Sequence, residues 1–314
     1  MFKRFKFLLI FLFLIIPYHV NAYSDYIIAS GENIGIKLKS KGIIVVGRYD
    51  DSNDFMHKGD IIVTVNNEEI SDIKSFTNKI SNNSSNTIEI GYIRDNKYNN
   101  TKLNIKNGKT GLYLKDTIVG IGTLTFIDPN NGQYGALGHE IVDSISGHII
   151  DVSKGIIYDS KVIDIKRSNQ GIPGEKNANI SNKELGDIQN NNKKGIYGNY
   201  KASIDNNKLY KVASISDIKL GKAYILTELE DNKIDKYEIN IISIDKKEDT
   251  KNIVFKVVDK RLLSIGGIVQ GMSGSPIVQG EYIVGAVTHV VVDNPYKGYG
   301  ILIERMLDEI EKDE

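Results

Sequence analysis

Apolar and polar residues alternate along most of the chain in short runs that Gly, Asn and Asp residues separate, a pattern typical of strands joined by turns. In the first third of the chain, the runs at residues 43–46, 61–65 and 88–93 predict strands, and residues 71–81 predict one helix. From Gly111 to about residue 303 the same alternation continues, which favours an all-β barrel or sandwich. We therefore predict a mainly β protein that begins with a small α+β domain.

Three further segments refine this organisation. Residues 168–198 are rich in Asn, Lys, Gly and Ser and poor in apolar residues, so we predict a long surface loop there. Residues 304–311 predict a charged helix that closes the chain. A polar Lys-Asn-Gly-Lys-Thr segment at residues 106–110 joins the two domains, which we place at residues 31–107 and 110–312.

The first 22 residues differ in kind from the rest. Three basic residues, Lys3, Arg4 and Lys6, precede an uninterrupted apolar run at residues 7–16, and small residues at 20 and 22 resemble a signal-peptidase site. The run is shorter than the roughly 20 residues that a membrane-spanning helix needs. We expect residues 1–22 to be an export signal, cleaved or kept as a membrane anchor, and the protein to be extracytoplasmic or membrane-associated.

Composition excludes several classes of function. The chain has 40 basic and 40 acidic residues, and a balanced charge argues against nucleic-acid binding, which requires a basic face. The absence of cysteine excludes disulfides, thiol catalysis and Cys-ligated zinc. The five histidines are scattered and match no metal-binding motif, so we predict neither a metal nor a cofactor.

The sequence Gln-Gly-Met-Ser-Gly-Ser-Pro at residues 270–276 is the strongest indication of chemistry. A Gly-x-Ser-Gly turn between apolar strands can expose a serine hydroxyl, which makes Ser273 a candidate nucleophile. The N–H groups of Gly271 and Ser273 could then converge on a developing oxyanion. The alternative interpretation is a flexible turn between two strands, because Gly and Ser are common turn residues.

A nucleophilic serine needs a base, and His139 is the best-placed histidine, since Gly and Ala residues before it allow close packing. His19 lies in the N-terminal segment and His57 in the small domain. His148 has no supporting context. His289 falls in a strand of period two and is expected to be a wall or core residue.

For the acid that orients the base, Asp259 is the first candidate. It ends a strand-like run and precedes the turn that leads to Ser273. Aspartate also commonly caps turns, so a purely structural role is the alternative. Spacing alone leaves Asp128 and Asp143 open as well.

Taken together, these motifs resemble the SpoIVB-type sporulation serine peptidases. The resemblance extends from about residue 30 onward and is carried by residues 120–129, 134–139, 266–277, 285–290 and 298–304. It implies a trypsin-like double β-barrel that follows a PDZ-like domain, with His139, Asp259 and Ser273 as the catalytic triad of an endopeptidase. The stretch between Asp259 and Ser273 is one residue shorter than in the family pattern.

The resemblance also implies a biological setting. Peptidases of this kind are secreted into the space between forespore and mother cell, cleave themselves, and cut a membrane-bound regulatory protein that controls a late sporulation sigma factor. By resemblance, the partners of this chain are therefore a protein substrate, which is expected to be a membrane-bound regulatory protein, the chain itself through self-cleavage and, through the N-terminal segment, a membrane surface.

The small domain carries a second resemblance. Residues 58–70 resemble the PDZ signature, and residues 33–38 resemble the loop of that fold that captures a peptide carboxylate. We accordingly expect peptide contacts from Asn33, Ile34, Gly35 and Ile36. The alternative is a spacer domain that has lost its groove.

Two other functions remain open. The protein could be an exported adaptor whose peptidase domain is inactive, although the retention of a plausible nucleophile, base and acid counts against it. It could also be an HtrA-like quality-control protease, but there the PDZ domain follows the catalytic one, whereas here it comes first.

Overall fold

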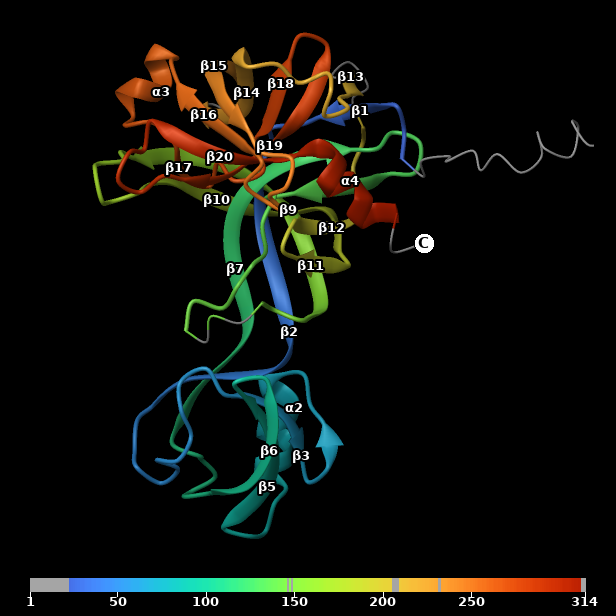
Figure 1. Ribbon diagram of the computed structural model, residues 1–314. Coiled ribbons are helices and arrows are strands. Elements are labelled where there is room, and N and C mark those ends of the chain that lie inside the picture. The colour runs from blue at the N-terminus through green and yellow to red at the C-terminus, as the bar shows by residue number, and fades with distance from the viewer. Residues whose placement is uncertain (1–22, 146, 148, 205–208, 231–232, 312–314) are drawn as a thin grey trace, which may run out of the picture.

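The computed structural model describes residues 23–145, 147, 149–204, 209–230 and 233–311. The chain is mainly β and consists of a small domain and a larger body, which two long strands connect (Figure 1). These are β2 (Asn33–Arg48) and β7 (Leu112–Ile127), each of 16 residues, which pair antiparallel. The N-terminal segment for which we predict an export signal lies outside the described residues. In the described part of the chain, no helix is long and apolar enough to cross a membrane.

The small domain confirms the strands and the helix predicted from the pattern. It is built from the second half of β2, β3 (Ile61–Val65), β4 (Glu68–Glu69), α2 (Ile73–Ser81), β5 (Thr87–Arg94) and β6 (Lys97–Asn104). The helix begins where the Asp72 carboxylate accepts a hydrogen bond from the Ser75 N–H, and it buries Phe76 and Ile80 against the sheet. These two side chains share one apolar core with Ile43 and Val45 of β2.

The body contains two barrel-like halves, each around its own apolar core. The first half combines the upper parts of β2 and β7 with β1 (Tyr26–Ala29), β8 (Gln133–Ala136), β9 (Val152–Lys166), β10 (Gly174–Ile188), β11 (Asn190–Asn192) and β12 (Gly195–Asn199). Its core includes Ile34, Leu38, Leu124 and Ile157, all fully buried. Alternate residues of each strand point into this core, as period-two patterning dictates.

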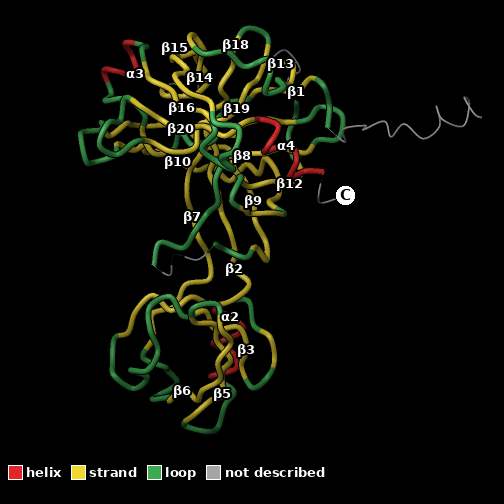
Figure 2. Tube along the Cα trace, in the orientation of Figure 1, coloured by secondary structure: helices red, strands yellow, loops and turns green. Residues whose placement is uncertain are grey.

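The second half follows in sequence. It contains β13 (Leu209–Val212), β14 (Gly221–Glu230), β15 (Lys233–Ile244), β16 (Ile253–Val257), α3 (Lys260–Ser264), β17 (Val269–Gln270), β18 (Pro276–Gln279), β19 (Tyr282–Val290) and β20 (Lys297–Leu302). The predicted C-terminal helix is α4 (Ile303–Glu311), one of the few helical segments in Figure 2. Its Met306 and Leu307 pack with Phe126 and Ile301, so the helix covers the junction of the two halves.

The surface loop predicted at residues 168–198 is wrong. Most of that segment is β10, which pairs antiparallel with β9 in a long hairpin, followed by β11 and β12. The middle of β10 is exposed on both faces. A strand with two solvated faces needs no apolar residues. The polar composition of β10 therefore suggested a loop rather than a strand.

The peptide-binding loop predicted at Asn33, Ile34, Gly35 and Ile36 is also wrong. These residues begin β2, where β7 pairs on one side and β9 on the other. Their side chains are buried in the body, and the Asn33 amide donates to the Ser160 hydroxyl at 3.0 Å. Because the backbone N–H groups of a central strand donate hydrogen bonds to the neighbouring strands, they are not available to a peptide carboxylate. The small domain accordingly begins later along β2 than residue 31.

Candidate active site

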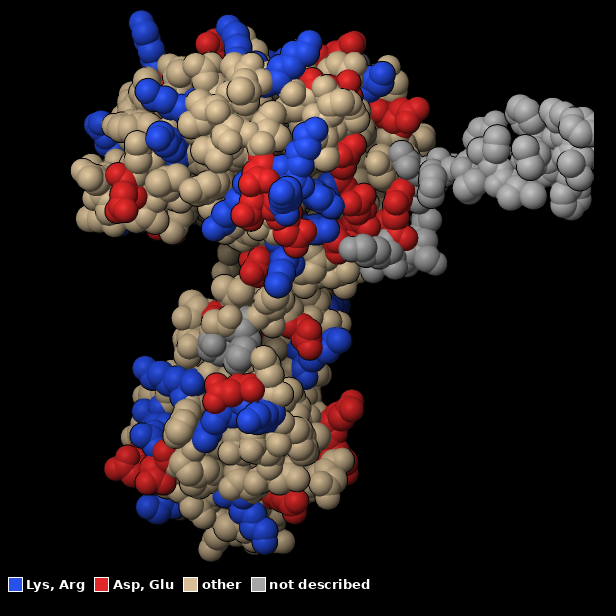
Figure 3. All heavy atoms as spheres, in the orientation of Figure 1, with Lys and Arg blue, Asp and Glu red and all other residues tan. Residues whose placement is uncertain are grey.

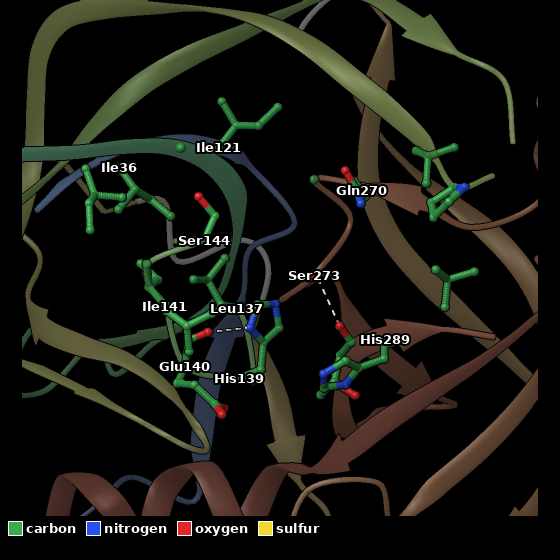
Figure 4. A pocket seen from close by; sticks show the side chains of 18 of the residues that line it. Ile36, Ile121, Leu137, His139, Glu140, Ile141, Ser144, Gln270, Ser273 and His289 are labelled. Carbon is green, nitrogen blue, oxygen red and sulfur yellow. Dashed lines mark hydrogen bonds between the residues drawn. The ribbon is translucent and has the colours of Figure 1, made fainter. Parts of the chain in front are cut away.

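A cleft of about 610 Å³ opens between the two halves of the body. Ser273 and His139 both line it, from opposite sides, and His289 lies beside them (Figure 4). Strand β7 contributes residues 118–121 to the same cleft. The structure thus brings together the predicted nucleophile and the predicted base, although 134 residues separate them in sequence.

The turn that carries Ser273 is fastened by hydrogen bonds to Thr123 and Thr125 of β7, in the other half. The Thr123 N–H donates to the Ser273 carbonyl at 2.9 Å, and the Thr123 hydroxyl donates to the Gly271 carbonyl at 2.8 Å. The Thr125 hydroxyl donates to the Gly274 carbonyl at 2.7 Å. We call residues 270–275 with these bonds the nucleophile loop. Its geometry depends on contacts across the two halves rather than on the loop alone.

The glycines of the nucleophile loop are needed for its backbone. Gly271 and Gly274 both have φ of +92°, a conformation that side chains rarely adopt. A Cβ on Gly274 would lie 2.1 Å from the Thr123 carbonyl oxygen. Within the described residues, no backbone hydrogen bond uses the N–H of Gly271 or of Ser273. These two groups are the predicted oxyanion donors.

The Ser273 hydroxyl donates to the Thr288 carbonyl on β19, at 2.9 Å. This carbonyl turns toward the cleft at an irregularity in the pairing of β19 with β20, between Val287 and His289. In this conformation the hydroxyl is not bonded to His139. It must rotate before the imidazole can accept its proton.

The base is positioned by its own backbone neighbourhood. Leu137 and Gly138, immediately before it, both have φ of +70°. Non-glycine residues rarely adopt this left-handed backbone conformation, and those that do cluster at functional sites. The Leu137 N–H donates to the Thr123 carbonyl at 3.3 Å, so the same strand that fastens the nucleophile loop also fixes the turn that presents His139.

The protonation of His139 suits a general base. Its Nδ1 lies 2.8 Å from the Glu140 carbonyl oxygen. Because a carbonyl can only accept, Nδ1 carries the hydrogen and Nε2 is left as the acceptor. Burial lowers the pKa of His139 below 6.5, against the opposing effect of Glu140. The imidazole is therefore neutral at pH 7.

His289 forms the wall beside the base, in keeping with its predicted position. The two imidazole rings have centroids 5.3 Å apart and planes inclined at 41°. Surrounding protein atoms lower the pKa of His289 to about 4, helped by repulsion from His139 and Lys251. Each histidine thus disfavours a proton on the other.

The structure does not bring Asp259 to His139. The Asp259 carboxylate caps α3 by accepting from the Arg261 N–H at 2.8 Å, and it forms an ion pair with the Arg261 guanidinium at 3.3 Å. It does not line the cleft. Partial burial acts to raise the pKa of Asp259, but hydrogen bonds from Arg261 and Glu238 outweigh burial and lower it. This arrangement is the capping role left open by the sequence, and the role of orienting acid stays a prediction from the family resemblance.

The two other aspartates differ in position. Asp128 is buried and accepts from the N–H and the hydroxyl of Ser24, away from the cleft. Asp143 lines the cleft and lies 3.9 Å from the Lys115 ammonium. The described residues contain no group of three or more His, Cys, Asp or Glu that could hold a metal ion.

Sequence reasoning missed four groups at this site: the side chains of Thr123 and Thr125 and the carbonyls of Glu140 and Thr288. The two threonines left a signal, because their i, i+2 spacing in a strand puts both hydroxyls on one face. The carbonyls left none, since every residue has one.

Aliphatic side chains make up most of the cleft wall. On the side of His139 they are Ile36, Ile118, Ile121, Leu137 and Ile141, and on the side of Ser273 they are Ile268, Val269, Val290 and Val292. Figure 4 shows Ile36, Ile121, Leu137 and Ile141 on one side and Ser273 with Gln270 and His289 on the other. The cleft can therefore receive apolar groups along both of its walls.

The comparison with family models shows the family of the chain. The model of the SpoIVB peptidase S55 family matches residues 106–307, more than half of the chain. The chain belongs to this family. It is therefore a serine peptidase, and the resemblance found in the sequence is confirmed. The matched region contains Ser273, His139 and Asp259 but not most of the small domain.

Two other comparisons add little. A search of curated proteins finds no match. Among solved structures, the Rv3671c protease in an inactive form is similar at 12% identity with a TM-score of 0.32, covering 61% of this chain and 83% of that one. A serine-to-alanine variant of Rv3671c from M. tuberculosis, also inactive, gives 12% identity and a TM-score of 0.33, covering 61% and 80%.

Proposed function

We propose that this serine peptidase is an endopeptidase in which Ser273 is the nucleophile and His139 the general base. The observation that supports this proposal most is that both side chains line one cleft. Nδ1 of His139 is already bonded to the Glu140 carbonyl, which leaves Nε2 to accept a proton. The neutral state of His139 at pH 7 fits the same role.

The reaction follows from this arrangement. Nε2 of His139 takes the hydroxyl proton of Ser273 as Oγ attacks the scissile carbonyl. The N–H groups of Gly271 and Ser273 stabilise the oxyanion. The imidazolium then gives its proton to the leaving amine, and water, activated by the same imidazole, releases the acyl group. In this state the Glu140 carbonyl orients the imidazole, and the Asp259 carboxylate acts only if it leaves Arg261.

The substrate class follows from the walls of the cleft. Aliphatic side chains on both walls of the cleft favour a substrate with aliphatic residues around the scissile bond, since burying each one contributes roughly 1.5–3 kcal/mol. The Thr288 carbonyl, which accepts from Ser273 here, could instead accept from the backbone of an extended substrate beside β19.

The biological role we infer is sporulation signalling, on the strength of the family. We propose that the exported enzyme cleaves itself and a membrane-bound regulatory protein. Cleavage of that regulator would trigger the activation of a late sporulation sigma factor. The small domain would dock a partner as a PDZ-like module, but by a surface other than residues 33–36, which the sheet of the body contains.

The test is cleavage of peptide libraries by the full chain and by Ser273→Ala. We expect cuts between aliphatic residues by the unmutated chain only, and the same difference in self-cleavage followed by intact mass. Cleavage that survives in Ser273→Ala would contradict the assignment of the nucleophile. Cleavage mainly next to Lys, Arg, Asp or Glu would contradict the substrate class.

A second candidate is an adaptor that has lost catalysis. One observation favours it: the Ser273 hydroxyl donates to Thr288 rather than to His139. Absence of cleavage by the unmutated chain, both alone and with its membrane-bound partner, would support the adaptor. Efficient digestion of unfolded casein would instead support a quality-control protease.

A further inference from the structure

Lys176 is a buried lysine directly beside the nucleophile loop. It lies on β10, only 1% exposed, just after the residues that pair with β17 at the entrance to that loop. A Cβ on Gly271 would lie 3.1 Å from the Lys176 Cβ, 3.2 Å from its Cδ and 3.3 Å from its Cγ. The aliphatic stem of Lys176 therefore fills the space next to Gly271.

The amine of Lys176 is held by β14. Nζ donates to the Thr227 hydroxyl at 3.0 Å, and the next residue, Glu228, is the charged group that acts on the amine. Glu228 is itself buried and accepts from the N–H groups of Asn33 and Val162, each at 3.5 Å. This polar cluster joins strands of both halves of the body behind the nucleophile loop.

Packing alone does not account for a lysine here. A methionine would fill nearly the same space without the cost of burying an amine, and replacing buried charged groups by apolar ones of similar shape is often neutral or stabilising. Burial lowers the pKa of Lys176 to about 7, although Glu228 opposes this. A costly cation has thus been kept beside the loop where negative charge develops during the reaction.

We propose that Lys176 is a positioning residue for the oxyanion hole: its stem fixes Gly271, and its ammonium, held by Thr227 with Glu228 as the nearby opposite charge, favours negative charge on the acyl intermediate at Ser273. This inference rests on the proposed function. The ammonium acts through the loop, across a low-dielectric interior in which a charge is weakly screened.

The test compares the unmutated full chain with Lys176→Met/Glu228→Gln, which removes both charges and keeps both shapes. The rate at which a fluorophosphonate labels Ser273 is measured together with the melting temperature. We expect labelling to slow about tenfold while the melting temperature stays equal or rises. The matched control is Lys222→Met/Glu238→Gln, which removes an ion pair of 2.7 Å on the exposed side of β14 and β15. It should leave labelling unchanged.

The pH profile of labelling separates a positioning role from a structural one. In the unmutated chain the rate should rise as His139 loses its proton and fall as the pH passes about 7, because the Lys176 ammonium deprotonates. The double variant should lack this fall. If the double variant does not fold, Thr227→Val is the second variant to test. It removes only the hydroxyl that holds the Lys176 ammonium, and it should move the fall in labelling rate to lower pH.

Labelling of the double variant within twofold of the unmutated chain, with the same pH profile, would overturn the role of Lys176. An unchanged fall in Thr227→Val would do the same. The failure of the unmutated chain to label at Ser273 at any pH is a different outcome: it would overturn the proposed function and this inference with it.

Discussion

The nucleophile loop and the turn at Asp259 lie close together in sequence, yet they are held in different ways. The loop is fastened by Thr123 and Thr125 from the other half of the body, and two of its glycines adopt left-handed backbone. Asp259 finds its partner two residues away in Arg261 and caps a short helix. Contacts from the other half of the body hold the first region, whereas residues of its own half hold the second.

This difference teaches where mutations should matter. Groups bonded within their own half should tolerate replacement by residues that can make the same bonds. Groups that join the two halves at the cleft should not, because they position Ser273 and His139. Figure 3 shows acidic and basic side chains mixed over the visible surface of the body and the small domain.

Gly274→Ala should have the largest effect. Its Cβ would meet the Thr123 carbonyl at 2.1 Å and the Leu137 N at 2.5 Å, both backbone atoms that fix the catalytic turns. We expect loss of detectable labelling and destabilisation of about 3 kcal/mol, measured by urea unfolding. The matched control is Gly280→Ala, at φ of +63° with nothing within 4 Å, which should cost about 1 kcal/mol and keep activity. Equal effects of the two substitutions would contradict the role of the contacts.

Thr123→Val should have the next largest effect. It keeps the shape of the side chain but removes the hydroxyl that donates to the Gly271 carbonyl. Leaving that carbonyl without its donor should loosen the oxyanion side of the loop and lower kcat/KM for a peptide by about 10- to 100-fold. Thr117→Val, on the same strand but bonded to Asp116, is the control and should stay within twofold. A full-rate Thr123→Val enzyme would show that β7 does not set the loop.

Asp259→Asn should have a small effect if the observed arrangement persists during catalysis. Asparagine caps helices nearly as well as aspartate, so the loss is mainly that of a partly exposed ion pair, about 0.5 kcal/mol, and kcat should change less than threefold. The measurement is kcat alongside urea unfolding. A fall in kcat of a thousandfold or more without loss of stability would instead establish Asp259 as the orienting acid that the family resemblance implies.

A pH titration should separate the cleft, through His289, from the turn at Asp259 by the pH window in which each loses stability. The folded pKa of His289, about 4, lies below its ordinary 6.5, so its contribution is complete above pH 6.5 and is lost as the pH falls toward 4. The carboxylate of Asp259, whose pKa is lowered from 3.8, loses its contribution only at more acidic pH. Melting temperatures of His289→Gln should therefore depend less on pH between 6.5 and 4 than those of the unmutated chain. A dependence equal to that of the unmutated chain would contradict this.

The sequence predicted much of the fold and part of the site, for physical reasons. The apolar runs at residues 43–46, 61–65 and 88–93 became strands because short runs rich in Ile, Val and Tyr suit a pleated, buried surface. The glycines around Ser273 indicated a backbone requirement, and Gly271 and Gly274 do adopt positive φ. In each case the residue type itself carries the geometry.

Where the sequence misled, the deciding partner was distant or had no sequence signal. Residues 33–36 look like the start of a separate domain, but their alternation of polar and apolar residues fits the core of the body equally well. In the structure, β9 pairs with the strand edge that a peptide would need. Lys176 becomes conspicuous only when folding buries it beside Gly271. Pairing between strands distant in sequence is information that a local pattern does not contain.

The most direct test of this account is the site and rate of fluorophosphonate labelling in the full chain, compared with His139→Ala and Ser273→Ala. We predict a single adduct on Ser273, a rate reduced at least a hundredfold in His139→Ala, and no adduct in Ser273→Ala. An adduct on another serine, or a rate that does not depend on His139, would contradict the pairing of these two residues as nucleophile and base.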